Sequence, residues 1–216
     1  MPKKFAAPYQ AVVYFPGGGA IFQRSSESLE LRSIDYIIES GRAVIYPIYK
    51  GTYERGDGLK TDAPTATSVY RDHVIQWSKD LGRAIDYLET RKDIQRDKIA
   101  YCGVSWGGAM GALLPAIESR LKANVMVVGG FNLQTTLPEV DQINFAPRVT
   151  QPTLMLNGRY DFFFPVETSQ RHTFRLLGTP TEHKRHKIFD TGHSVPREQV
   201  VQETLAWLDK YLGPVK

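Results

Sequence analysis

The sequence predicts an α/β fold, a mostly parallel sheet of about six strands with helices on both faces. Short apolar runs rich in β-branched residues alternate with longer segments whose apolar residues recur at helical spacing. This alternation is typical of βαβ units, whose crossovers are right-handed. The composition agrees, because 216 residues with 42% hydrophobic and 23% charged residues suit one compact domain, expected over 1–216.

The first half of the chain contains two expected strands and two expected helices. Residues 11–15 are predicted to be a strand, which ends at the run Pro16-Gly17-Gly18-Gly19. Apolar residues between 29 and 38 predict a helix that ends at Gly41. Residues 43–46 predict a second strand, followed by a polar loop over 49–66. From Tyr70 to Leu88 the apolar residues step by three or four, which predicts a long amphipathic helix.

The second half continues the alternation. Four more strands are expected at 99–104, 125–128, 153–156 and 186–189. Helical runs are expected over 109–117, 168–177 and 201–212, the last ending at Gly213-Pro214. In such sheets ligands bind beyond the carboxyl ends of the strands, so the residues that follow each strand are the candidates for function.

Charge and cysteine content exclude several classes of protein. The chain has 27 Lys and Arg against 23 Asp and Glu, a small excess of positive charge. The one basic cluster, residues 184–187 with His183 beside them, is interpreted as a charged edge strand rather than a nucleic-acid site. No apolar run is long enough for a membrane span, and no signal-peptide core follows Met1, so a soluble chain is expected. Cys102 is the only cysteine, which excludes an internal disulfide and a Cys-rich zinc site.

The segment Gly103-Val104-Ser105-Trp106-Gly107 matches G-x-S-x-G at an expected strand-to-helix junction. A serine on such a sharp turn exposes its hydroxyl at the edge of the sheet, and the glycines leave room for the turn. The helix start then favours developing negative charge. We therefore predict that Ser105 is a nucleophile rather than an idle serine at a glycine-rich helix start.

A nucleophilic serine needs a base, and the base needs an acid that orients it. Asp161 follows the strand at 153–156, and His193 follows the strand at 186–189, so the chain order is serine, acid, histidine. Asp190 is the rival acid, but it is only three residues from His193 and would point poorly at the far ring nitrogen. His73, His172, His183 and His186 lie in expected helices or the charged strand, where we expect ordinary surface or core roles.

Acyl transfer also needs hydrogen-bond donors for the oxyanion. The backbone N–H of Trp106 is one candidate, and the loop of Gly17 and Gly18 should supply the other. A glycine-rich loop can also bind phosphate, but no Lys-Ser/Thr follows and G-x-G-x-x-G is absent.

With these residues the chain resembles an α/β-hydrolase over most of its length. It is most similar to the dienelactone-hydrolase-like and prolyl-oligopeptidase-like branch, on the segments 12–19, 50–56 and 152–161. The resemblance implies Ser105 as nucleophile, Asp161 as acid, His193 as base, and an oxyanion hole of Gly17 or Gly18 with Trp106. Two features depart from the family. Pro16 stands before the glycines Gly17 and Gly18, where related enzymes often have a histidine. The two strands that usually precede the strand at 11–15 are missing or minimal, as expected of a catalytic domain excised from a longer protein.

We interpret the chain as a serine carboxylesterase for short-chain carboxylic esters, with no metal or organic cofactor and no nucleic-acid or membrane partner. Dienelactone hydrolases proper use a cysteine nucleophile, so Ser105 argues against that substrate. Two alternatives are a serine peptidase acting on short peptides and a non-catalytic binding domain of the same fold.

The connection 129–152 leaves no room for a large lid. Four side chains there either line the site or pack on the core: Leu133, Leu137, Ile143 and Phe145. Phe162, Phe163 and Phe164 are expected to narrow the acyl side.

Overall fold

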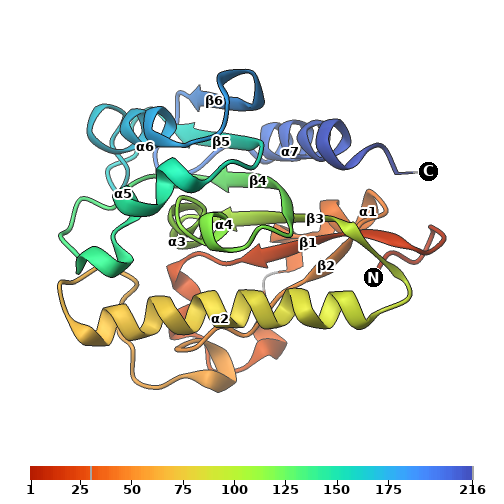
Figure 1. Cartoon of the computed structure of the whole chain (residues 1–216), viewed down its shortest axis with the longest axis horizontal. Helices are drawn as coiled ribbons and strands as arrows, with labels where there is room; N and C mark the ends of the chain where they lie inside the picture. Colours follow the sequence, from red (N-terminus) through yellow and green to blue (C-terminus); the bar gives the residue numbers. More distant parts are fainter. Residues whose placement is uncertain (30, 216) are drawn as a thin grey trace.

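A computed structural model describes residues 1–29 and 31–215, and its centre is a six-stranded sheet in the order β2-β1-β3-β4-β5-β6 (Figure 1). Every neighbouring pair in this sheet is parallel. The strands are β1 (Tyr9–Phe15), β2 (Ala43–Ile45), β3 (Ile94–Val104), β4 (Leu121–Val127), β5 (Thr153–Gly158) and β6 (Lys184–Phe189). The expected α/β-hydrolase architecture is confirmed, and all the carboxyl ends lie at one side, to the left in Figure 1.

Helices cover both faces of the sheet. On one face lie α2 (Ser68–Thr90), α3 (Trp106–Met110), α4 (Leu114–Ile117), α5 (Gln142–Phe145) and α6 (Arg171–Leu176). The other face packs against α1 (Asp35–Glu39) and α7 (Arg197–Leu212). The alternation of side chains along each strand separates the two cores, since Tyr101 faces α2 while its neighbour Cys102 faces the α7 side.

Local sequence explains where the helices differ from the expectation. The predicted helix over 29–38 is wrong for most of its length, because only α1 forms and Leu31–Ser33 make a 3₁₀ turn; residue 30 lies outside the described residues. Just before this segment, the hydroxyls of Ser25 and Ser28 bond nearby backbone or side-chain groups, as is common in turns. The run 109–117 is interrupted between α3 and α4, since Pro115 lacks an N–H and excludes a continuous helix.

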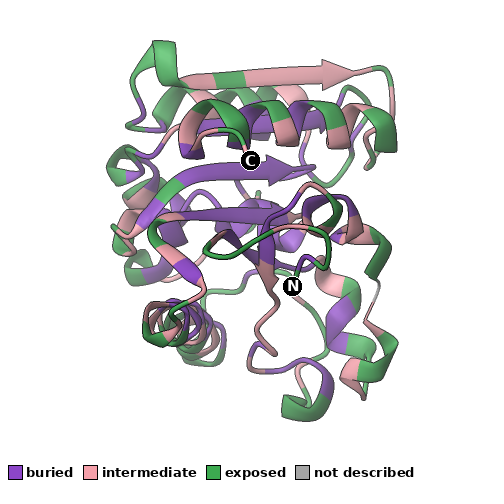
Figure 2. Cartoon of the chain, turned by 90° about the vertical axis from the view of Figure 1, so that its right-hand side faces the viewer, coloured by how far each residue is buried: buried purple, intermediate pink, exposed green. Residues whose placement is uncertain are grey.

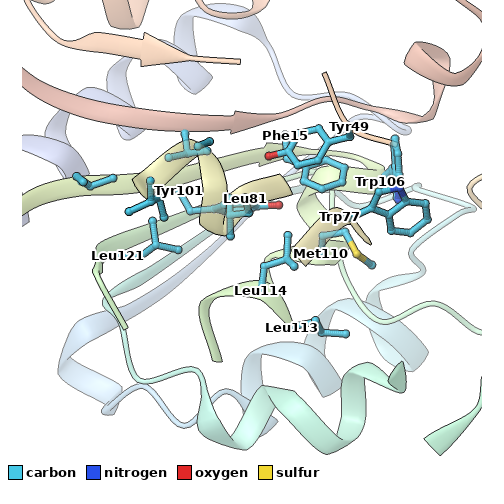
Figure 3. Close-up of a cluster of buried hydrophobic side chains, with 14 of the residues drawn as sticks. Phe15, Tyr49, Trp77, Leu81, Tyr101, Trp106, Met110, Leu113, Leu114 and Leu121 are labelled. Atoms are coloured by element: carbon cyan, nitrogen blue, oxygen red, sulfur yellow. The ribbon is translucent and has the colours of Figure 1, made fainter. Parts of the chain in front are cut away.

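A cluster of aromatic rings anchors the turn that holds Ser105 to the sheet (Figure 3). The ring of Trp106 meets Phe15 of β1 and Trp77 of α2 edge-on, each with ring centroids 4.7 Å apart. Phe15 in turn stacks on Tyr49 at 3.9 Å. Because these side chains are all buried, the first residue of α3 is held rigidly against β1 and α2.

The basic residues predicted to form an edge strand do so, since β6 is the last strand of the sheet. In Figure 2 this strand, at the top, is half-exposed, while the central strands are buried. Arg185 and Lys187 form ion pairs with Glu203 of α7.

Cys102 is fully buried, and burial raises the pKa of its thiol to about 12, which makes it a small apolar core residue. Within residues 1–29 and 31–215, no helix is long and apolar enough to cross a membrane.

Candidate active site

Ser105 occupies a strained turn between β3 and α3. Its backbone has φ 54° and ψ −109°, a conformation that costs a non-glycine residue about 1–3 kcal/mol. A Cβ atom on Gly107 would overlap the carbonyl oxygen of Phe15, and one on Gly103 would overlap the carbonyl of Gly107. The Ser105 N–H donates to the Val127 carbonyl (2.9 Å), which ties the turn to β4. The glycines of the motif are therefore required by close backbone packing on both sides of the serine.

The structure brings Ser105, His193 and Asp161 together at the carboxyl ends of β3, β6 and β5. The Nε2 atom of His193 lies 2.8 Å from the Ser105 Oγ, and its Nδ1 atom lies 2.8 Å from the Asp161 Oδ2. The ring thus has one hydrogen-bonding contact on each nitrogen. With a proton on Nδ1, it can donate to the carboxylate and accept the serine proton at Nε2.

The Asp161 carboxylate is buried and held from two directions. Its Oδ1 atom accepts hydrogen bonds from the backbone N–H groups of Phe163 (2.9 Å) and Phe164 (3.1 Å). This arrangement leaves Oδ2 for His193 and fixes the orientation of the carboxylate. Asp190, the rival acid, instead forms an exposed ion pair with Arg159 (2.6 Å).

The loop after β1 runs beside the serine. A Cβ atom built on Gly17 would lie 3.5 Å from the Ser105 Cβ, so the loop backbone and Ser105 are in contact range. Gly18 begins a 3₁₀ turn (Gly18–Phe22), and Trp106 begins α3, positions whose N–H groups have no partner within their own helix. Within the described part of the chain, the N–H groups of Gly17, Gly18 and Trp106 donate to no backbone acceptor. They are free to bind an anionic oxygen.

Two hollows meet at His193. One has a volume of about 600 Å³ and is lined by Ser105, His193, Leu133 and the three phenylalanines after Asp161. The other, about 640 Å³, lies toward α7 and is lined by His193 and the valines at 127, 128, 195, 200 and 201, among others. The two hollows therefore leave space for a bound molecule on either side of His193.

The four side chains of the 129–152 connection have three different surroundings. Leu133 lines the first hollow, whereas Leu137 and Phe145 pack against the core beneath α2. Ile143 is exposed on the surface. The ring of Phe163 meets the His193 ring edge-on, with centroids 4.7 Å apart, so part of the aromatic run shields the imidazole.

The other histidines have structural surroundings. His73 bonds Asp57 (2.9 Å) and the Val69 carbonyl (2.7 Å), and His183 bonds the Tyr211 hydroxyl (3.1 Å). His172 is exposed on α6. His186 belongs to β6 and its ring lies against Phe174 of α6, where burial lowers its pKa to about 4.

One site residue was missed by the sequence reasoning. Asp62 lies in the loop between β2 and α2, lines the first hollow and lies against Gly18. Burial raises the pKa of its carboxyl above the ordinary value, while the nearby His193 opposes that shift. Nothing in the polar segment 49–66 singles out Asp62, because its importance comes from the path of the loop across the sheet edge.

Comparisons with known proteins give the same fold and a family. The model of the Dienelactone hydrolase family matches residues 22–201. The chain is 26% identical over 136 residues to "Putative hydrolase YtaP" of Bacillus subtilis (strain 168), a match that spans 57% of this chain and 44% of that relative.

Solved structures with low sequence identity share the architecture. Est1E from Butyrivibrio proteoclasticus, solved with bound ferulic acid, has a TM-score of 0.72 at 14% identity and covers 98% of this chain and 93% of its own. The acetyl xylan esterase from Paenibacillus sp. R4 has a TM-score of 0.68 at 17% identity, covering 97% of this chain and 77% of its own. The matched span includes the serine turn, the loop of Asp161 and the loop of His193, and the chain belongs to the dienelactone hydrolase family.

Proposed function

We propose that the chain is a serine carboxylesterase that hydrolyses short-chain carboxylic esters through an acyl-enzyme on Ser105. The observation that carries the proposal is the continuous chain of contacts from Ser105 Oγ through His193 to Asp161, with both distances at 2.8 Å. A serine with a base in hydrogen-bond reach, and a base oriented by a third group, is the arrangement that nucleophilic acyl transfer requires.

The reaction begins when the Ser105 Oγ attacks the ester carbonyl and His193 takes the serine proton at Nε2. Asp161 stabilises the imidazolium that forms. The carbonyl oxygen becomes an oxyanion, which the N–H of Trp106 and that of Gly18 or Gly17 stabilise, each donor contributing about 2.7–4 kcal/mol. The C–O bond to the alcohol then breaks, and His193 returns the proton to the leaving alcohol. A water molecule, activated by His193, hydrolyses the acyl-enzyme by the same steps in reverse.

The proposed preference for short acyl groups rests on the shape of the site. Phe162 and Phe163, which line the first hollow, are 73% and 55% exposed, so the hollow lies open to solvent. A long acyl chain would therefore gain only part of the ~0.8 kcal/mol that each fully buried methylene contributes.

The test combines a substrate panel with one variant. Nitrophenyl esters and aminoacyl-anilides are offered to the wild-type chain and to Ser105→Ala, and a fluorophosphonate probe is used to label both. We expect ester turnover and labelling that the variant loses, with a fall in kcat of up to about 10⁶-fold on the precedent of other triads. Faster turnover of anilides than of esters would favour the peptidase alternative. Neither turnover nor labelling would favour a binding domain, and retention of a tenth of the rate in the variant would reject Ser105 as nucleophile.

A further inference from the structure

The carboxylate of Asp62 lies directly against the loop beside the nucleophile. A Cβ atom built on Gly18 would be 2.6–2.8 Å from the Oδ1, Cγ and Oδ2 atoms of Asp62, so the carboxylate covers this glycine. The adjacent residue, Gly17, flanks Ser105 itself. Asp62 also lines the same hollow as Ser105 and His193, which places a negative charge inside the substrate space.

No cationic side chain neutralises this charge. Within residues 1–29 and 31–215, Asp62 has no ion pair and no hydrogen bond from another side chain. By contrast, Asp57 of the same loop contacts Lys50 and His73, and Asp80 of α2 contacts Arg55. Burial raises the pKa of Asp62, and a hydrogen bond from its own backbone N–H and the nearby His193 oppose that shift only in part. An unpaired carboxylate that is partly buried in a substrate hollow is a costly feature unless a ligand supplies its partner.

The charge is also unfavourable for the reaction of a neutral ester. The tetrahedral intermediate carries a negative oxygen near Gly17 or Gly18, and the carboxylate of Asp62 repels it. A positively charged substrate group between the oxyanion and the Asp62 carboxylate would remove this repulsion. It would also bind more tightly in the transition state, where the negative charge on the oxygen develops. The rest of the hollow suits a cation too, because the rings of Phe22, Phe162 and Phe163 line it and aromatic faces attract ammonium groups.

We propose that Asp62 is a specificity-determining residue that binds the ammonium group of a cationic ester. The preferred substrates then carry a protonated amine a few bonds from the scissile carbonyl, as aminoacyl esters do. This inference rests on the proposed esterase function, since it concerns which esters react at Ser105.

The test uses pairs of esters that match in shape and differ in charge. In the L-alanine and isobutyrate nitrophenyl esters, an ammonium group replaces a methyl group beside the carbonyl. Acetylthiocholine and 3,3-dimethylbutyl thioacetate make the same comparison on the leaving-group side. The ratio of kcat/KM for the cationic and the neutral ester is measured at pH 6 and low salt, in the wild type and in Asp62→Asn. Comparing ratios between proteins cancels the different intrinsic reactivity of the esters.

We expect the cationic-to-neutral ratio of at least one pair to fall tenfold or more in Asp62→Asn, and the rate on the neutral ester to rise. Asp57→Asn removes a paired carboxylate from the same loop and should leave both ratios unchanged. If Asp62 only supports the loop, its replacement lowers both rates by the same factor, and the inference is overturned. Ratios that stay within twofold of the wild type overturn it as well. If the wild type hydrolyses none of the four esters, the proposed function fails first, so the two failures are distinguishable.

Discussion

The Asp161→Asn substitution examines how the proposed base is oriented. Asparagine has nearly the same size as aspartate, and its amide oxygen can keep the two hydrogen bonds from Phe163 and Phe164. The amide NH₂ then faces the Nδ1 atom of His193, where the carboxylate oxygen now lies at 2.8 Å. Two donors cannot face each other, so the ring must accept at Nδ1 and carry its proton at Nε2. In that tautomer His193 cannot take the proton from Ser105.

The expected loss follows from the tautomer. In other serine enzymes this exchange lowers kcat by about 10³–10⁴-fold, which corresponds to about 4–5.5 kcal/mol of transition-state stabilisation. The assay is the initial rate of hydrolysis of nitrophenyl acetate at saturating substrate, with thermal unfolding followed by circular dichroism to show that the variant is folded.

Asp190→Asn is the matched control. Asp190 is 74% exposed and pairs with Arg159 at the surface, and exposed ion pairs contribute about 0–1 kcal/mol. We expect its kcat to stay within threefold of the wild type. A large loss in Asp190→Asn with little change in Asp161→Asn would refute the assignment of the acid, and equal small effects would refute the orientation argument.

Three further outcomes are expected. In urea unfolding, Gly107→Ala should lower the free energy of unfolding by about 3 kcal/mol or more, because the new Cβ would overlap the Phe15 carbonyl. Gly19→Ala is the control, since a Cβ there meets open space, and it should change the free energy by less than about 0.5 kcal/mol. Similar values for the two variants would contradict the packing argument. His186 has a folded-state pKa of about 4, below its unfolded value of 6.5, so the unfolded chain binds this proton at a higher pH than the folded chain does. The free energy of unfolding of the wild type should therefore fall by up to about 3 kcal/mol as the pH falls from 6.5 towards 4. In His186→Leu this part of the pH dependence of the unfolding free energy should vanish, and an unchanged slope would mean that the ring is protonated in the fold. Across nitrophenyl esters from acetate to palmitate, kcat/KM should peak at two to six acyl carbons, and a maximum at ten or more would require a deep acyl tunnel instead of the open hollow.

Hydrophobic periodicity and one local motif predict much of this molecule. Each of the six predicted strands has a counterpart in the sheet; β1 to β5 contain apolar runs bounded by glycine, proline or polar residues, whereas β6 is mostly basic. The candidates Ser105, Asp161 and His193 could be selected from sequence because each directly follows a predicted strand, and parallel strands bring their carboxyl ends to one edge. Strand starts were predicted less well, since β3 begins at Ile94 through long-range pairing with Tyr9.

Other features are decided only by the tertiary structure. The helix expected over 29–38 is shortened to α1, because helical propensity over so short a segment is weak. Asp62 became a candidate only when the loop after β2 was seen to cross the carboxyl edge of the sheet and lie on Gly18. Residues 44 positions apart in the chain are brought together there by packing. The sequence by itself thus determines the class of fold and the chemistry that is available, because both depend on local patterns. Which charges meet in the substrate hollow depends on long-range packing, which no local pattern encodes.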